Sequence, residues 1–489
     1  MLGSSHGQLA KALLPKVVGT TTMKAGSMRD FLEGYVMRAA FSPWLLVLAL
    51  IVNLGSASLV YGEAFRVLGQ GNSGTAQGDA FAAQADDPSA IFYNPAGITQ
   101  LEGIQLSASV LFIAGHYDYE SPDGEKFKGN LNGSIATPPP TNLYLTAKLD
   151  KLGNKLGTKL MDNIALGVGI NSPFGLVINW PNNVPFSAVT TFAQLPLIDV
   201  KPTLAFKANE YLSVGAGLDI YTFISFLGGG EVRTRSFFPP NSNAAINGKD
   251  TAVGFNIGFL LTPWRTEADL GEKPRLNLAF VYRSAATLHL TGDFLIDGQK
   301  AARANFDLKL PQIFTWGAAL WPIRDRTNEW KFETDLDYVD WSTFKDLDIR
   351  LSNGITIPQP RNWKNIVTIK VGTEYKWLEI PSLPDWELAV RAGYIRANTP
   401  VPELTFDPRI PNADFNGASF GIGVLCKGNA MFLGLFVCGN GVIKAIGLDL
   451  IYKNQLYDSR RINNNIDPTV NGKYKTELQA GGIGVRINF

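Results

Sequence analysis

The stretch EAFRVLGQGNSGTAQGDAFAAQADDPSAIFYNPAG, residues 63–97, determines how the rest of this chain must be arranged. It is rich in glycine, alanine, serine and aspartate, and it has no hydrophobic period of its own. A segment of this composition cannot fold alone, because it buries too little apolar surface to offset the entropy lost on ordering. We therefore expect it to lie against or inside a larger structure that the following residues build.

After residue 103 the chain changes to a two-residue period, which is typical of β-strands with one apolar and one polar face. In residues 366–375, for example, apolar or small side chains alternate with Thr368, Lys370 and Glu374. Clusters of Gly, Pro, Asn and Asp separate such stretches, and short connections alternate with long ones. At roughly 30 residues per strand and connection, the chain after residue 62 predicts about fourteen strands.

A large soluble β-sandwich would show the same alternation, so a second signal is needed to choose between the two. Aromatic residues gather near predicted strand ends, as at Trp330, Tyr375 and Trp377, which is typical of the interfacial girdles of membrane barrels. The last strand, GGIGVRINF, ends in an aromatic residue, as many outer-membrane barrels do. We predict an all-β transmembrane protein: an antiparallel outer-membrane β-barrel of about 14 strands, with an N-terminal hatch, or plug, inside its lumen.

The first residues have the layout of an export signal. Residues 39–62 contain no charged side chain, WLLVLALIV (44–52) forms an apolar core, and basic residues precede it. Small residues then lead to a predicted cleavage site after Gly62. A membrane-spanning anchor is the alternative. The expected domains are a cleaved leader and signal peptide (1–62), the hatch (63–103) and the transmembrane barrel (104–489).

Composition and motifs argue against other classes of function. The formal net charge of +1 provides no electrostatic attraction to nucleic acid, and three histidines argue against a histidine-rich metal site. Residues 69–74 fit G-x-G-x-x-G, but a dinucleotide site needs a buried strand before it and a helix after it. Residues 417–421 fit G-x-S-x-G within a predicted strand, where a nucleophile elbow needs a strand, a turn and a helix. We expect no enzyme activity and no cofactor; a lipolytic enzyme using Ser419 is the third hypothesis.

Two cysteines, Cys426 and Cys438, lie twelve positions apart. In an oxidising compartment they could close a disulfide, which we favour, or remain two unpaired thiols in strands. The spacing does not match a C-x-x-C metal or redox motif.

Residues 86–97, DDPSAIFYNPAG, resemble the N-terminal hatch of the FadL family of outer-membrane transporters, which carries an Asn-Pro-Ala motif. Further stretches are similar to family segments and keep the family's order. They are NSPFGL (171–176), KPTLAFKAN (201–209), LSVGAG (212–217), DYVDWSTF (337–344), NWK (362–364), RAGY (391–394), and PVP (400–402) with PNAD (411–414). The likeness extends from residue 63 to the C-terminus.

The resemblance implies a passive transporter of hydrophobic molecules in the bacterial outer membrane, carrying long-chain fatty acids or aromatic or aliphatic hydrocarbons. In that family, ligand leaves the lumen sideways, through a kinked strand, into the lipid. The implied partners are the hydrophobic ligand, outer-membrane lipid and the barrel assembly machinery, and we expect a monomer. The family's carboxylate-binding basic residues do not align with this chain, so the sequence leaves the cargo open.

Within the hatch we expect Phe65, Phe92, Asn94, Pro95 and Ala96 to lie on the ligand path. Pro95 lacks a backbone donor and restricts Asn94 to extended or turn geometry, which suits a gating turn or a static one. The main alternative function is a general diffusion porin without ligand specificity. The hatch argues against it, because porins usually begin with a strand soon after the cleavage site.

Overall fold

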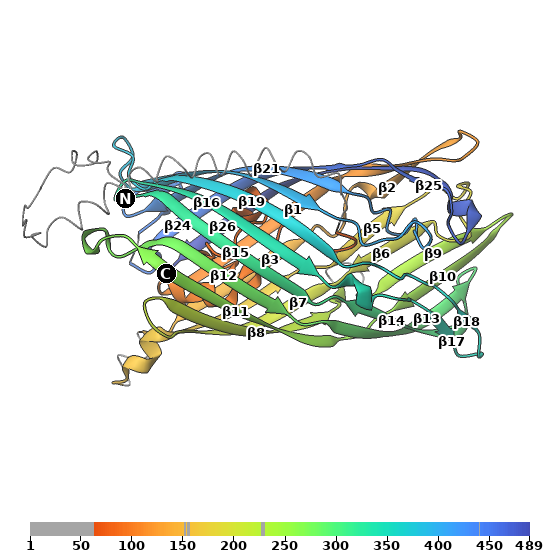
Figure 1. Ribbon diagram of the computed structural model, residues 1–489, viewed down its shortest axis with the longest axis horizontal. Coiled ribbons are helices and arrows are strands. Elements are labelled where there is room, and N and C mark those ends of the chain that lie inside the picture. Colours follow the sequence, from red (N-terminus) through yellow and green to blue (C-terminus); the bar gives the residue numbers. More distant parts are fainter. Residues whose placement is uncertain (1–62, 151–152, 154–156, 226–229, 440) are drawn as a thin grey trace, which may run out of the picture. The chain divides into compact units, whose positions relative to one another are not determined.

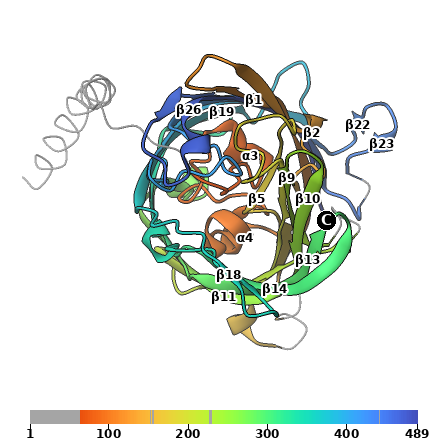
Figure 2. The ribbon, with the colours of Figure 1, turned by 90° about the vertical axis from the view of Figure 1, so that its right-hand side faces the viewer.

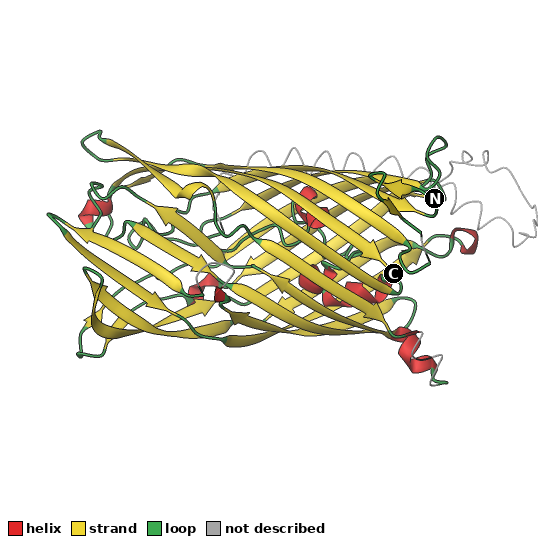
Figure 3. Cartoon of the chain, turned by 180° about the vertical axis from the view of Figure 1, so that it is seen from behind, coloured by secondary structure: helices red, strands yellow, loops and turns green. Residues whose placement is uncertain are grey.

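The computed structural model describes residues 63–489 apart from 151–152, 154–156, 226–229 and 440. The predicted leader and signal peptide lie outside the described residues, so their cleavage stays a prediction. Strands dominate this part of the chain, and its helices are short (Figure 3). No helix among the described residues is long and apolar enough to cross a membrane.

Fourteen strands in the described part of the chain pair in antiparallel order to form a closed barrel (Figure 1). In order around the wall they are β1 (Ile104–Glu120), β3 (Thr141–Lys148), β4 (Ile164–Asn171), β7 (Ile198–Lys207), β8 (Leu212–Thr222), β11 (Ala252–Arg265), β12 (Pro274–Arg283), β15 (Ile313–Arg324), β16 (Asn328–Val339), β19 (Ile366–Trp377), β20 (Trp386–Ala397), β21 (Phe415–Lys427), β24 (Ala445–Tyr457) and β26 (Gly472–Asn488). The barrel closes because β1 pairs with β26 from Gln105–Asn488 to Glu120–Lys473. The prediction of a barrel of about fourteen antiparallel strands is confirmed, and with it the choice against a soluble sandwich.

One end of the barrel, which we call the turn end, is where β1 begins and β26 stops. At the other end, the loop end, a further row of strands extends the wall from β1 (Figure 1). In pairing order they are β2 (Lys126–Ile135), β5 (Gly175–Asn179), β6 (Phe192–Pro196), β9 (Val232–Phe238), β10 (Ser242–Gly248), β13 (Ala286–Ile296), β14 (Gln299–Leu310), β17 (Ile349–Leu351) and β18 (Thr356–Ile357). A short β25 (Arg460–Ile462) pairs with β26, and β22 (Met431–Phe432) and β23 (Phe436–Val437) form a separate hairpin.

The wall is apolar outside and polar inside, which is the inverse of a soluble protein. On β21, Phe420 and Ile422 are 59% and 55% exposed, and each lies between residues that point outward on neighbouring strands. On β16 the buried face carries charged side chains: Glu329, Lys331, Glu333, Asp335 and Asp337. An apolar outer face and a polar lumen are what the hydrocarbon core of a bilayer requires of a barrel.

Residues 63–97 lie within the ring of strands, where Figure 2 shows α3 (Asn72–Ala76) and α4 (Ala90–Tyr93). We call residues 63–101 the internal segment; it ends in η1 (Pro95–Gln100). Nearly all of its residues are buried. The polar lumen of the barrel thus supplies the surroundings that this segment could not make for itself.

Candidate functional site

Two carboxylates of β16 hold the middle of the internal segment. Asp335 Oδ2 accepts hydrogen bonds from the backbone N–H groups of Phe81 and Ala82, both at 2.9 Å. Glu333 Oε1 accepts from the next two, those of Ala83 at 2.7 Å and Gln84 at 3.2 Å. Four consecutive amides thus point at wall carboxylates, an arrangement of charge-assisted bonds that fixes this stretch to the lumen.

Buried ion pairs fix the segment on either side of that stretch. Lys453 of β24 lies 2.7 Å from Asp79, and Arg66 lies 2.6 Å from Asp337. Asp337 also pairs with Lys370 of β19 at 2.6 Å. Removing one partner of such a pair would leave an uncompensated buried charge, so these contacts hold the segment in a single place.

The predicted path residues Asn94, Pro95 and Ala96 pack tightly against β8 and β11. Asn94 has an extended backbone; its side chain accepts from the Ala96 N–H at 3.1 Å and donates to the carbonyls of Ala82 (2.9 Å) and Phe259 (3.1 Å). On the wall, glycines permit this approach, because a Cβ at Gly215 or Gly258 would overlap Pro95 or Asn94. The turn is therefore part of a close fit between segment and wall.

The other two predicted path residues lie in different surroundings. Phe92 lies under the guanidinium of Arg283, 4.3 Å from its ring centroid. Phe65 contacts four aromatic rings near the loop end, with centroids 4.9–6.1 Å away: Phe174, Trp341, Phe344 and Trp363. Phe65 also lines a small cavity near the loop end. The other four predicted path residues line neither that cavity nor the two larger ones on either side of it.

Backbone pairing around the barrel is interrupted at one place in the wall. Between β2 and β3 the chain runs through Ala136-Thr137-Pro138-Pro139-Pro140, and between β4 and β5 through Ser172-Pro173-Phe174. β3 pairs with β4 only as far as Leu143–Ile170, and β2 pairs with β5 only at Asn130–Asn179. Prolines cannot donate ladder hydrogen bonds, so the β2–β3 connection and the β4–β5 connection do not pair with each other here. We call this interruption the wall gap.

The internal segment takes the place of the missing strand neighbour on one side of the wall gap. Val67 N–H donates to the carbonyl of Pro173, and Gly175 N–H donates to that of Phe65, both at 2.9 Å. Gln70 also joins the internal segment to the β4–β5 connection, through both the nitrogen and the oxygen of its side-chain amide. Its Nε2 donates to the carbonyls of Val67 and Ser172 at 2.9 and 3.0 Å, and its Oε1 accepts from Asn171 Nδ2 and Ser172 N at 2.9 and 3.2 Å.

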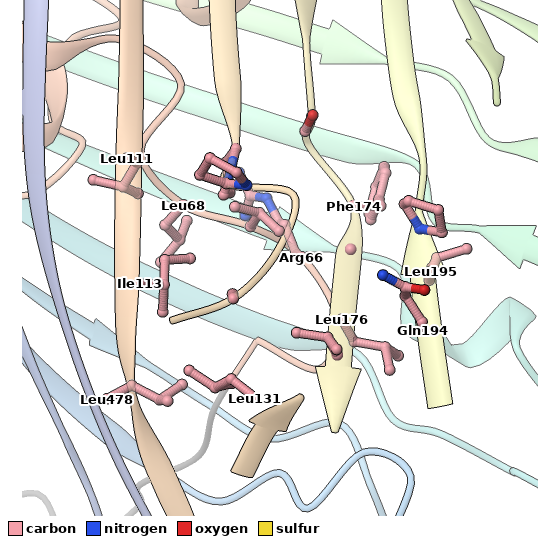
Figure 4. A pocket seen from close by; sticks show the side chains of 18 of the residues that line it. Arg66, Leu68, Leu111, Ile113, Leu131, Phe174, Leu176, Gln194, Leu195 and Leu478 are labelled. Atoms are coloured by element: carbon pink, nitrogen blue, oxygen red, sulfur yellow. The ribbon is translucent and has the colours of Figure 1, made fainter. Parts of the chain in front are cut away.

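An apolar cavity of about 400 Å³ lies at the wall gap (Figure 4). Its inner side is formed by Val67 and Leu68 of the internal segment with Leu111 of β1, and its outer side by Pro139 and Leu143. Leu143 is 42% exposed on the outer face of the barrel. The gap cavity therefore extends from the internal segment to the lipid-facing surface.

Two more cavities lie between the gap cavity and the loop end. A small one of about 90 Å³, lined by Phe65, shares Leu195 and Arg409 with the gap cavity. A third of about 440 Å³ lies among β10, β17, β18 and the 405–409 loop, and shares Arg361 and Arg409 with the small one. We call these the arginine cavity and the mouth cavity. Together the three line up from the loop end to the wall gap.

The arginine cavity combines apolar walls with positive charge. Among the described residues that line it, Arg233, Arg361 and Arg409 are charged and none is acidic. Arg361 pairs with Asp407 at 2.8 Å, yet its Nε and that of Arg409 are buried without a hydrogen-bond partner. Burial lowers the pKa of Arg361 despite the nearby carboxylate of Asp407.

The structure also places the remaining sequence motifs. Ser419 lies within β21, where its hydroxyl accepts from the Gly78 N–H and donates to the Ala76 carbonyl at 2.9 and 3.1 Å. It binds the internal segment by these contacts.

Cys426 and Cys438 form a disulfide with their Cα atoms 5.7 Å apart. No sequence motif marks Gln70 or the arginines as functional, whereas the prolines at 138–140 and 173 are a sequence signal for the gap.

Comparison with known proteins identifies the family. Residues 55–430 match the family described as outer membrane protein transport protein (OMPP1/FadL/TodX). This chain is a member of that family. The long-chain fatty acid transport protein of Escherichia coli K12 is 23% identical over 375 residues, covering 68% of this chain and 77% of that protein. The resemblance, the transporter class and the outer-membrane location inferred from the sequence are confirmed.

Solved structures of family members share the fold of this chain. A FadL homologue from Pseudomonas aeruginosa superposes with a TM-score of 0.66 at 18% identity, covering 87% of this chain and all of that one. The toluene transporter TbuX of Ralstonia pickettii superposes with a TM-score of 0.59 at 14% identity, covering 86% and 98%. At these identities the likeness shows the fold of this FadL-family chain, the barrel, and not its cargo.

Replacing Gln70 with alanine should loosen the wall gap. Its amide makes four hydrogen bonds, and each buried polar group left unpaired costs about 1–3 kcal/mol. Amide hydrogen exchange around residues 171–175 should therefore accelerate about 10- to 100-fold. Gln77→Ala is the matched control, because the Gln77 side chain donates only to Ser73 and Gln84 within the segment itself. Unchanged exchange at 171–175 in Gln70→Ala would contradict the role given to Gln70.

Proposed function

We propose that this protein carries long-chain fatty acids passively across the outer membrane and releases them sideways into the lipid through the wall gap. The observation that carries the proposal is the gap cavity, which reaches the outer face where the wall strands do not pair. Cargo enters at the loop end through the mouth cavity and passes the arginine cavity. No energy source is needed, because burial of the apolar fatty-acid tail in the cavities is favourable and its transfer from there into the membrane lipid is favourable too.

A fatty acid suits this path better than a neutral hydrocarbon does. The arginine cavity has three guanidinium groups and no acidic lining residue among those described, while most of its wall is apolar. A carboxylate head would offer acceptors to the unpaired Nε atoms of Arg361 and Arg409. The apolar tail would meanwhile lie along Leu176, Leu195 and Phe65. The name of the E. coli relative agrees with this choice.

In this proposal the internal segment is the hatch. Its contacts with the wall carboxylates and with the glycines of β8 and β11 keep it in the lumen, so water and ions have no straight path. Cargo needs only a local rearrangement of residues 67–70 beside the gap cavity, and Arg66 keeps its ion pair with Asp337. The Asn94-Pro95-Ala96 turn then serves as the fixed base of the hatch, and Phe65 lies where the path meets it.

A general diffusion porin is the alternative function. An open pore requires a lumen free of protein along its length, and the internal segment occupies that space with nearly every residue buried. Planar-bilayer recordings distinguish the two. A large steady conductance in the purified protein would favour the porin, and a closed baseline supports the transporter.

Filling the gap cavity should block release. Ala136 lines this cavity and is 7% exposed, so Ala136→Trp introduces a ring where the tail would pass. Transfer of a fluorescent fatty acid from protein to surrounding lipid should slow by at least about tenfold, the rate effect of ~1.4 kcal/mol in the barrier. Ala216→Trp, on the lipid-facing side of β8 away from the gap, is the control. Equal transfer rates in the two variants would rule out the sideways route.

Removing a guanidinium should affect acids more than neutral analogues. Arg409→Gln removes a charged donor from all three cavities, and hydrogen bonds to charged groups contribute about 1.5–3 kcal/mol. Binding of a long-chain fatty acid should weaken about 10- to 100-fold, while binding of the alcohol of the same length changes little. Arg235→Gln is the control, since Arg235 lies over Phe192 and outside the three cavities. An equal loss for acid and alcohol would show that Arg409 shapes the path without recognising the head group.

A further inference from the structure

A feature of the turn end is explained neither by the barrel nor by the transport path. Residues 428–443, between β21 and β24, contain no charged side chain, and the described ones, 428–439 and 441–443, form an extension. We call it the apolar hairpin. Other connections at the same end carry charges, as at Glu210 and at Glu267, Asp269 and Asp325. The family match ends at residue 430, so most of the apolar hairpin lies beyond it.

The hairpin is held rigidly at its base. The disulfide between Cys426 and Cys438 ties it to the end of β21, and both cysteines are fully buried. Phe432 stacks on Trp386 of β20, with ring centroids 6.4 Å apart. Its two strands pair at Met431–Val437 and Phe432–Phe436. The base is thus a small core of its own, continuous with the outer surface of the barrel.

The tip of the hairpin is exposed and apolar. Leu433, Leu435 and Phe436 are 72%, 71% and 61% exposed, and Met431 is 51% exposed. Leu433 has a φ of 51°, in the left-handed region where glycine or asparagine is ordinarily favoured. Large apolar side chains thus occupy a turn in which small polar ones would be less strained and better hydrated. A contiguous exposed apolar surface of this kind marks an interaction site.

The position of the apolar hairpin outside the barrel indicates that lipid covers its tip. Viewed along the barrel in Figure 2, β22 and β23 stand outside the ring of strands. The hairpin therefore reaches over the region that lipid occupies around an outer-membrane barrel. It also starts beside Trp386, an aromatic residue at a strand end, where such residues mark the membrane interface.

We propose that the apolar hairpin is an interfacial anchor that inserts its tip into phospholipid at the turn end of the barrel. Transfer of an uncharged, apolar tip from water to the boundary between head groups and acyl chains lowers the free energy. The disulfide and the Phe432–Trp386 stack preorganise the hairpin, so little conformational entropy is lost on insertion. The anchor would fix the depth and tilt of the barrel, and with them the level at which the wall gap meets the lipid.

A nitroxide attached to Leu435→Cys tests this in the folded full chain. The native cysteines are bonded and buried, so the new thiol is labelled selectively without reductant. Barrels are reconstituted in vesicles of phosphatidylethanolamine and phosphatidylglycerol, and folding is verified by heat-modifiable migration. Collision of the label with oxygen and with a water-soluble nickel chelate is then measured. The matched control is Ala268→Cys, in an exposed charged turn at the same end.

The proposal predicts that the label at position 435 collides several-fold less with the nickel chelate, and more with oxygen, than the label at 268. Equal access of the chelate to both labels would overturn it, because the tip would then face water. Spin–spin broadening at 435 that disappears on dilution with unlabelled protein would also overturn it, because a second copy would then cover the tip. Neither outcome bears on fatty-acid transport, so the anchor and the proposed function fail separately.

Discussion

Every backbone N–H and C=O group within a bilayer must find a partner inside the protein, and the rest of this structure depends on that constraint. A complete ring of fourteen strands satisfies it by itself. The prolines at 138–140 and 173 break the ladder, and the internal segment restores it on one side, through Val67, Gln70 and the backbone of Phe65. The opening in the wall and the segment inside the lumen are therefore two parts of one solution.

Charge provides the second level of organisation. Because the lumen face of the strands is polar, wall strands offer carboxylates and ion pairs to the segment, as β16 and β24 do. These contacts hold residues 79–84 firmly. The stretch beside the gap is held by the Gln70 side-chain amide, by the backbone hydrogen bonds at Val67 and Gly175, and by apolar packing of Leu68. A hatch with a sideways exit requires firm contacts in its middle and contacts beside the gap that open locally.

Much of the architecture could be predicted from the sequence, because strand periodicity and turn residues are local signals. The alternation at residues 366–375 predicts β19 with its polar side chains inward, and the small-residue composition of 63–97 predicts that it needs a host. The position of the Asn-Pro-Ala turn against the wall could not be predicted from local signals. Its location depends on Gly215 and Gly258, which lie more than a hundred residues away in the chain, and the sequence carries no mark of that contact.

The same limit applies to the path. Phe65 reaches it and Phe92 does not line it, although both are aromatic residues of the same segment. In the sequence, Gln70 resembles any polar residue of a glycine-rich loop, and only the fold brings it against Ser172, between β4 and β5. Arg361 and Arg409 come from two loops and meet Arg233 of β9 near the loop end. Long-range contacts of this kind follow from closure of the barrel and have no periodic signature.

The most direct measurement is photo-crosslinking of a long-chain fatty acid with a diazirine near its terminal methyl group to the protein in lipid vesicles, followed by peptide mapping. Sideways release predicts adducts at the gap cavity, on Leu68, Leu111, Leu143 and Leu176. Adducts confined to the turn end of the lumen, on Thr99 and Ser213, would mean that cargo travels along the barrel axis, and would contradict the account.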